Sequence, residues 1–213
     1  MADVLSARRA VRLNLLSAGS FVCGGSLFAA GAALAQRDPD EPRVAAVTYL
    51  VGGFFFSLGG FLSVLLAGRA RSRARLSAVV LFVGTLFFAV SLVAAFASGL
   101  TPRQSNGWIW FPDIIGCVCF LASGHLALVD VGDGRWVVRP GVLTWWVAAV
   151  NQLGSAFFFL AGLAAFIRPA TDQVVNAGLV NWGTFAGAVC FVGGAVLQAF
   201  DTPTSTRTAG LVT

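Results

Sequence analysis

The chain has 213 residues and a mean hydropathy of +0.83, and 57% of its residues are hydrophobic while only 11% are charged. An ordinary soluble domain carries about 25% charged residues, so this composition excludes a soluble enzyme, a disordered tail and a disulfide scaffold. The net charge of +5 comes from 14 basic residues, all of them arginine, and 9 acidic residues. We therefore expect an integral membrane protein.

Six segments are apolar and long enough to cross a bilayer, whose core of about 30 Å needs roughly 20 residues of helix. Five of them contain no charged residue and no histidine, whereas the fourth contains Asp113, His125 and Asp130. The loops are short, so neighbouring helices must form antiparallel hairpins. The predicted fold class is all-α, a polytopic membrane protein with six transmembrane helices. The expected spans are 13–35, 44–67, 77–99, 108–130, 144–167 and 177–200.

These spans pair into three hairpins between a basic cytoplasmic N-terminus and a flexible cytoplasmic tail. The expected boundaries are 1–12 for the N-terminus, 13–67, 77–130 and 144–200 for the hairpins, and 201–213 for the tail. An alternative for the first span is a cleaved signal peptide, because two arginines precede an apolar run that ends in Ala33-Leu34-Ala35. The run of about 23 residues exceeds the usual signal-peptide core of about 7–15 residues, which favours a retained helix.

Arginine is unevenly distributed between the two sets of loops. Ten arginines lie on the side of the two termini and four lie on the other side. Since cytoplasmic loops carry an excess of basic residues, both termini are predicted to face the cytoplasm, with the chain in the plasma (inner) membrane. The arginines are interpreted as topology signals or contacts to anionic lipid headgroups, not as a nucleic-acid site. The ten are Arg8, Arg9, Arg12, Arg69, Arg71, Arg73, Arg75, Arg135, Arg139 and Arg207; the four are Arg37, Arg43, Arg103 and Arg168.

The hairpins share a pattern of glycine and phenylalanine that indicates an internal repeat. The third and fifth spans carry Gly-Thr/Ser-x-Phe-Phe from Gly84 and Gly154. The fourth and sixth spans carry Gly-x-Val-Cys-Phe from Gly116 and Gly187, and Gly52 has the comparable place in the second span. We expect three copies of one hairpin, related by an axis along the membrane normal.

The register of the first span is ambiguous, because either Gly19 or Gly25 can begin the pattern. The glycines of the two helices are 32 residues apart in the second hairpin and 33 apart in the third. They are also 33 residues apart from Gly19 to Gly52, which favours Gly19.

A Gly-Ser-x-x-Phe start, an aromatic residue before the second helix and Gly-x-x-x-Phe within that helix resemble the YrhK-like domain family. The closest stretch runs from Asn151 to Asp201, and the third and fourth spans look like a diverged copy. The resemblance implies a small bacterial membrane protein. It brings no established activity and no catalytic residues.

Three polar residues inside the expected spans are candidates for function, because ionisable groups at membrane depth are usually functional. Asp113 follows Pro112, and both are favoured at helix starts, so a helix start at the outer interface competes with a cation or proton site. His125 is the only histidine, either a neutral side chain hydrogen-bonded between helices or a proton relay. Asn151 is expected to hydrogen-bond between helices.

Glycine lets transmembrane helices approach closely, and Gly183-x-x-x-Gly187 is a small-xxx-small motif of this kind. We expect the missing side chain of Gly187 to lie against another helix and not against lipid. The expected helix contacts are Gly52, Gly84, Gly116, Gly154, Gly183 and Gly187.

Three classes of function remain open. A structural or accessory membrane protein of unknown biochemical activity fits every observation, and the alternative is a small-solute transporter or channel around the repeat axis. An enzyme is not expected, because no set of acid, base and nucleophile is visible. No metal or cofactor is expected, because the lone histidine has no evident ligand partners. The predicted partners are the lipid bilayer and a second copy of the chain or another membrane protein.

Overall fold

The computed structural model describes residues 2–39, 41–68 and 72–201. Within these residues, six helical segments are long and apolar enough to cross a membrane, which confirms the all-α, polytopic fold. The long helices are α1 (Ala2–Arg37), α2 (Pro42–Ala67), α3 (Arg73–Ala94), α5 (Phe111–Val131), α6 (Leu143–Ala164) and α7 (Ala177–Phe200). The short elements are α4 (Pro102–Ser105), the π-helix η1 (Asn106–Trp110), and the strands β1 (Ile167–Arg168) and β2 (Gln173–Val174).

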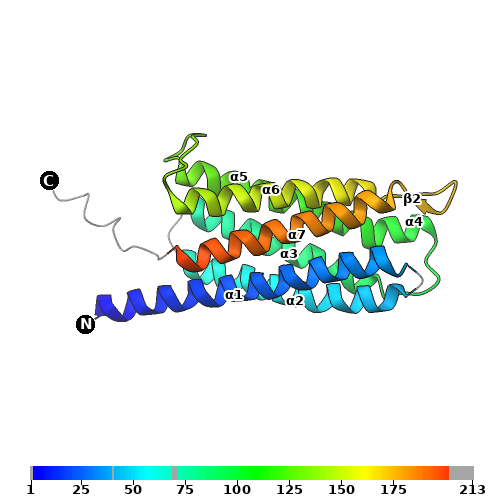
Figure 1. The fold of residues 1–213 in the computed structure, drawn as a ribbon, viewed down its shortest axis with the longest axis horizontal. Coiled ribbons are helices and arrows are strands. Elements are labelled where there is room, and N and C mark those ends of the chain that lie inside the picture. Colours follow the sequence, from blue (N-terminus) through cyan, green and yellow to red (C-terminus); the bar gives the residue numbers. More distant parts are fainter. Residues whose placement is uncertain (1, 40, 69–71, 202–213) are drawn as a thin grey trace.

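The six long helices form a closed ring. Each hairpin packs its own two helices together, as α1 with α2, α3 with α5, and α6 with α7. The hairpins then meet through α2 with α3, α5 with α6, and α7 with α1. Figure 1 shows the helices side by side, with the start of α1 and the end of α7 at one end and α4 and β2 at the other. We call these the terminal end and the distal end.

Two helical segments begin six or more residues earlier than expected. The first starts at Ala2, so the predicted N-terminal segment 1–12 is, from Ala2 onward, part of α1. At 1.5 Å per residue its 36 residues measure about 54 Å, more than a bilayer core, and its first turns project beyond the bundle (Figure 1). The fourth spanning segment starts at Pro102, because Thr101 and Gln104 form a reciprocal capping box there. The predicted tail, from 202 on, lies outside the described residues.

A small β-hairpin, which the sequence had not indicated, connects α6 to α7. β1 and β2 pair antiparallel, with Ile167 opposite Val174. The chain reverses between them through Asp172, whose φ of 55° is in the left-handed region. Aspartate tolerates that conformation better than most side chains, which explains how the turn forms without glycine.

Six phenylalanines, one from each long helix, meet in the middle of the ring. We call this group the phenylalanine cluster: Phe28, Phe56, Phe88, Phe120, Phe158 and Phe191. Within each hairpin the two rings lie close, with centroid distances of 5.2, 5.0 and 5.2 Å. The three rings of the second helices also contact one another, at 5.5 to 6.3 Å. The hairpins are therefore joined through this cluster.

Each ring of the cluster packs against a glycine of the partner helix. A Cβ atom on Gly84 would lie 2.8 Å from the Phe120 ring, and one on Gly116 would lie 2.7 Å from the Phe88 ring. The same pairing joins Gly154 to the Phe191 ring, at 3.2 Å. Such distances are shorter than most real Cβ contacts, so a side chain at these positions would push the rings away, which favours glycine where these helices cross. The remaining pairs are Gly187 with Phe158, Gly24 with Phe56, and Gly52 with Phe28.

The register expected for the first span was wrong. Gly24 packs against Gly52 and Phe56, whereas a Cβ on Gly19 would meet no atom within 4 Å. The spacing argument failed because it measures loop length as well as register, and the connection over 38–41 is shorter than the others. All three hairpins thus use the same glycine–phenylalanine contact, but their origin as copies of one unit stays a prediction.

Candidate functional site

Two cavities lie inside the ring, on either side of the phenylalanine cluster. The terminal cavity has a volume of about 250 Å³ and the distal cavity about 260 Å³. Each is lined by residues from all six long helices, so both lie on the bundle axis. A void of about 10 Å³ remains between them, lined mainly by rings of the cluster. The interior is therefore a row of spaces interrupted by aromatic rings.

The cluster supplies the inner wall of both cavities. Phe120 and Phe191 line the terminal cavity, and Phe28, Phe88 and Phe158 line the distal one. A water molecule needs about 10–15 Å³ of such space, so the void between the cavities holds one water at most. The cluster closes the axis in this conformation.

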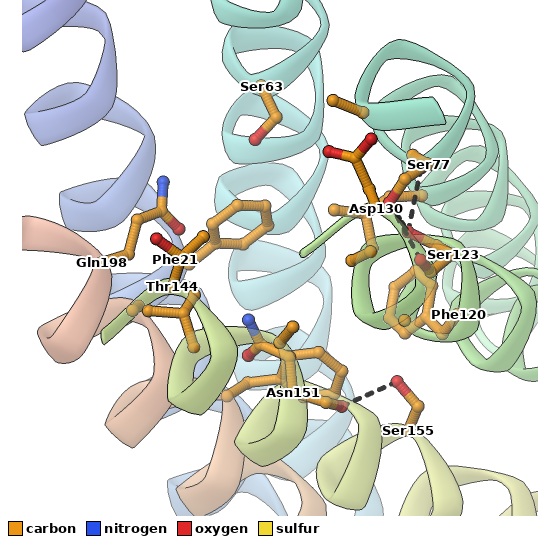
Figure 2. Close-up of a pocket in the computed structure, with 18 of the residues that line it drawn as sticks. Phe21, Ser63, Ser77, Phe120, Ser123, Asp130, Thr144, Asn151, Ser155 and Gln198 are labelled. Atoms are coloured by element: carbon orange, nitrogen blue, oxygen red, sulfur yellow. Dashed lines mark hydrogen bonds between the residues drawn. The ribbon is translucent and has the colours of Figure 1, made fainter. Parts of the chain in front are cut away.

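The terminal cavity has a mainly apolar lining, and its polar groups are amides, hydroxyls and one carboxylate. Figure 2 shows Asp130, Asn151 and Gln198 around it, contributed by α5, α6 and α7. On its wall Ser77 and Ser123 bond reciprocally, each hydroxyl donating to the other residue's carbonyl at 2.9 Å. These bonds join α3 to α5, so the Ser77 and Ser123 hydroxyls are engaged in contacts between helices.

The polar residues near this cavity have different partners. The Asn14 amide donates to the Gln198 carbonyl at 2.9 Å, and the Gln198 amide donates to the Asn14 side-chain oxygen at 3.2 Å, which joins α1 to α7. The Asn151 side chain instead contacts Gly194, and its backbone carbonyl accepts from the Ser155 hydroxyl at 2.9 Å. Among the described residues no side chain hydrogen-bonds the Asn151 amide, which faces the terminal cavity.

The distal cavity combines one carboxylate with aromatic rings. Asp113 is its single acidic lining residue, and no arginine or histidine lines it. Within the described part of the chain no group donates a hydrogen bond to the Asp113 carboxylate. Its aromatic lining residues are Phe28, Tyr49, Phe88, Trp110 and Phe158, and its hydroxyl residues are Ser91, Ser105 and Thr184 together with Tyr49.

Asp113 lies in the first turn of α5, as expected, but that turn is not where the spanning segment begins. Because α4, η1 and α5 run on without a break, Asp113 lies eleven residues past Pro102, roughly 16 Å into the segment. Pro112 was the misleading signal. The π-helix immediately before it supplies the local change of backbone pairing that lets a membrane helix contain proline.

Hydrogen bonds from η1 connect the elements at the distal end of the bundle. The Asn106 amide donates to the Ile167 carbonyl at 2.7 Å, and the Ile167 N–H donates back to the Asn106 oxygen at 2.9 Å. The Trp110 indole donates to the Gly162 carbonyl at 2.8 Å. These bonds attach β1 and the end of α6 to η1 at the edge of the distal cavity. Sequence reasoning missed Asn106, Trp110 and Tyr49, although Tyr49 is the single tyrosine and lies in an apolar run.

His125 lies apart from both cavities. Its side chain is exposed on the outer face of α5, and its Nδ1 accepts a hydrogen bond of 3.2 Å from the Trp136 indole. Trp136 follows α5 in the connection to α6, so the partner is a loop residue and not another helix. The predicted interhelical hydrogen bond was wrong, and the position gives a proton relay through the interior no support.

The remaining predicted residues are packing glycines. Gly183 and Gly187 both lie against α6: a Cβ on Gly183 would be 3.0 Å from that of Ala161, and one on Gly187 would meet the Phe158 ring.

Asp130 lines the terminal cavity, and among the described residues it forms no ion pair with Arg135, while Arg139 pairs with Asp133 at 2.8 Å.

Comparisons with known proteins leave the family open. Scans against protein-family models, curated proteins and solved structures found no significant match to this chain. The function is therefore argued from the two cavities and the cluster alone.

Proposed function

We propose that this chain is an integral membrane protein that passes a small solute along the axis of its six-helix ring. The observation that supports this role is the row of cavities, each lined by all six helices and separated by a single layer of rings. A transporter or channel needs space on both sides of a barrier, and a purely structural bundle has no need of aligned axial cavities. In this proposal the phenylalanine cluster is the closed barrier, and rotation of its rings or a shift between hairpins opens it.

The role is proposed as transport and not as catalysis. The single described histidine is on the outer face, away from both cavities, and each cavity holds one carboxylate with no base beside it. Among the described residues neither carboxylate hydrogen-bonds a hydroxyl or thiol that it could activate as a nucleophile.

Flux through reconstituted liposomes tests this proposal. We would compare protein-free liposomes, the wild type, Phe120→Ala and Phe54→Ala, using efflux of K⁺, tetramethylammonium and glycerol. Phe120 belongs to the cluster, whereas Phe54 is 66% exposed on the lipid-facing side of α2 and serves as the matched control. We expect Phe120→Ala to raise the efflux of at least one solute tenfold or more over Phe54→Ala. Phe120→Leu, a smaller change, should give an intermediate flux if Phe120→Ala folds poorly.

A structural or accessory role is the second candidate, and the tight packing of the cluster favours it. The ring centroids lie 5.0 to 6.5 Å apart and leave almost no space between them. If folded Phe120→Ala and Phe120→Leu give the same efflux as protein-free liposomes for every solute, the transport proposal fails and the structural role stands.

We further propose that the chain lies in a bacterial plasma membrane with both termini in the cytoplasm. The ring supports this orientation, because the described arginines of the larger group belong to the terminal end and those of the smaller group to the distal end. Arg69, Arg71 and Arg207 lie outside the described residues. A reporter fused after Ser72 should be cytoplasmic and one fused after Glu41 external; the reverse pattern would overturn the orientation.

Membership of the YrhK-like family and descent of the hairpins from one unit are also proposals. The shared glycine–phenylalanine contact supports both, since it recurs in all three hairpins. The proposed partners are the bilayer lipids around the apolar outer faces, and a second copy or another membrane protein. Removal of α1 at a signal-peptidase site would open the ring, which favours the retained helix.

A further inference from the structure

We propose that the distal cavity binds a small organic monocation of the alkylammonium class, with Asp113 as its counter-ion and the surrounding rings as its walls. This names a substrate class for the axial path and rests on the proposed transport function only for movement across the membrane. The binding itself follows from the residues of the cavity.

The first argument is charge. Asp113 is the one charged residue among those lining the cavity, and no described group donates to its carboxylate. A carboxylate at membrane depth is costly unless it is neutralised or paired. Every basic side chain of the described chain lies elsewhere, so the charge that balances Asp113 has to come from a ligand or from a proton.

The second argument is the aromatic wall, which distinguishes an organic cation from a bare proton. Five aromatic residues line the cavity, and the Phe28 ring lies 5.3 Å from Tyr49 and 5.9 Å from Phe158. Phe88 lies 6.2 Å from Phe158, which continues the wall on the other side. Ring faces attract ammonium and alkylammonium groups through their quadrupole, and aromatic cages of this kind recognise such cations.

The third argument is against a divalent metal ion as the preferred cation. Divalent cations take six or more oxygen ligands, or several carboxylates, and the distal cavity offers one carboxylate and a few hydroxyls. Within residues 2–39, 41–68 and 72–201 no three His, Cys, Asp or Glu side chains gather at one place. The hydroxyls of Ser91 and Thr184 instead suit the N–H groups of a primary ammonium.

The size of the cavity limits the ligand. Its volume of about 260 Å³ lies just below the range of about 300–1,000 Å³ that is typical of sites for drug-sized molecules. A single ring or a short alkyl chain bearing one ammonium group fits this description.

Calorimetric titration of the detergent-solubilised protein tests the site. The probes are phenethylammonium and its neutral analogue phenethyl alcohol, each titrated into the wild type, Asp113→Asn, Asp113→Glu and Asp130→Asn. We expect the cation to bind the wild type at least tenfold more tightly than the alcohol does. Asp113→Asn should weaken cation binding at least tenfold, Asp113→Glu should retain most of it, and Asp130→Asn, in the terminal cavity, should leave it unchanged.

Three results would overturn the site: no binding of the cation to the wild type, equal binding of the alcohol, or equal losses in Asp113→Asn and Asp130→Asn. Thermal unfolding of each variant checks that the bundle is intact, and Asp113→Glu supplies a second test if Asp113→Asn is unstable. Binding is measured in micelles, so it does not depend on transport. Cation binding without flux would support the site and contradict the transport proposal. Flux together with cation binding that does not depend on Asp113 would support transport and contradict the site.

Discussion

The phenylalanine cluster and the distal cavity use the same aromatic rings in opposite ways. In the cluster, rings pack against glycines and against one another, and almost no space remains. On the distal side, Phe28, Phe88 and Phe158 border an open space that is also lined by the Asp113 carboxylate. Glycine opposite each ring lets the two helices of a hairpin approach closely at the cluster. The proposed barrier and the proposed binding site are thus adjacent parts of one aromatic structure.

The largest effect is expected from removing a ring of the cluster. Phe56 is 3% exposed and its ring lies within 6.3 Å of four others, whereas Phe54 on the same helix is 66% exposed. Phe56→Ala should lower the free energy of unfolding by about 3–5 kcal/mol, the usual cost of a large cavity in a core. Thermal unfolding in detergent would show this as a marked fall in midpoint, against little change for Phe54→Ala. Similar small shifts in both would mean that the cluster is not the core.

A smaller loss is expected where a side chain is added instead of removed. Gly187→Leu would drive atoms into the Phe158 ring, and overpacking of this kind costs about 1–3 kcal/mol. The matched control is Val189→Leu, since Val189 is 49% exposed on the outer face. Equal unfolding midpoints for Gly187→Leu and Val189→Leu would contradict the contact between α6 and α7.

The spans could be predicted from the sequence, because hydropathy alone identifies a segment that is apolar and long enough to cross a membrane. Their ends could not, because α1 continues past its arginines to Ala2 and the fourth segment begins at Pro102, after a cap formed by Thr101. Neither feature depends on hydropathy. The glycine–phenylalanine pattern was visible in the sequence, but the pairing of Gly24 with Gly52 depends on loop length and needed the structure.

The candidate site was predictable only in part. Asp113 stood out as a charged residue in an apolar segment, but the sequence did not indicate what surrounds it. Its neighbours Tyr49 and Phe158 come from α2 and α6, which are distant in the chain, so they are found only once the ring is closed. His125 stood out for the same reason as Asp113, yet its side chain faces outward. The sequence did not reveal this, because periodicity alone does not say which side of a helix meets the axis.

The loss of the Asn106 side chain should destabilise the distal end locally. Asn106→Ala removes both hydrogen bonds to Ile167, with an expected cost of about 1–2 kcal/mol that is confined to β1 and η1. Hydrogen exchange of the Ile167 amide should become faster while exchange in the middle of α5 is unchanged. Asn181→Ala, which removes one exposed bond to Gln36, is the control and should leave the Ile167 amide as it is. Unchanged exchange at Ile167 would show that the hydrogen bonds between Asn106 and Ile167 are not formed.

Thiol labelling from each side of the membrane tests the central claim, that two cavities are separated by a closed cluster. In a chain whose four cysteines are replaced by alanine, single cysteines would be placed at Thr184, Ala127 and Thr85 in reconstituted vesicles. Thr184 lines the distal cavity, Ala127 lines the terminal cavity, and Thr85 is 1% exposed at the cluster. We predict that a membrane-impermeant thiol reagent labels Thr184→Cys from one side, Ala127→Cys from the opposite side, and Thr85→Cys from neither. Labelling of Thr184→Cys and Ala127→Cys from the same side, or rapid labelling of Thr85→Cys, would contradict the account.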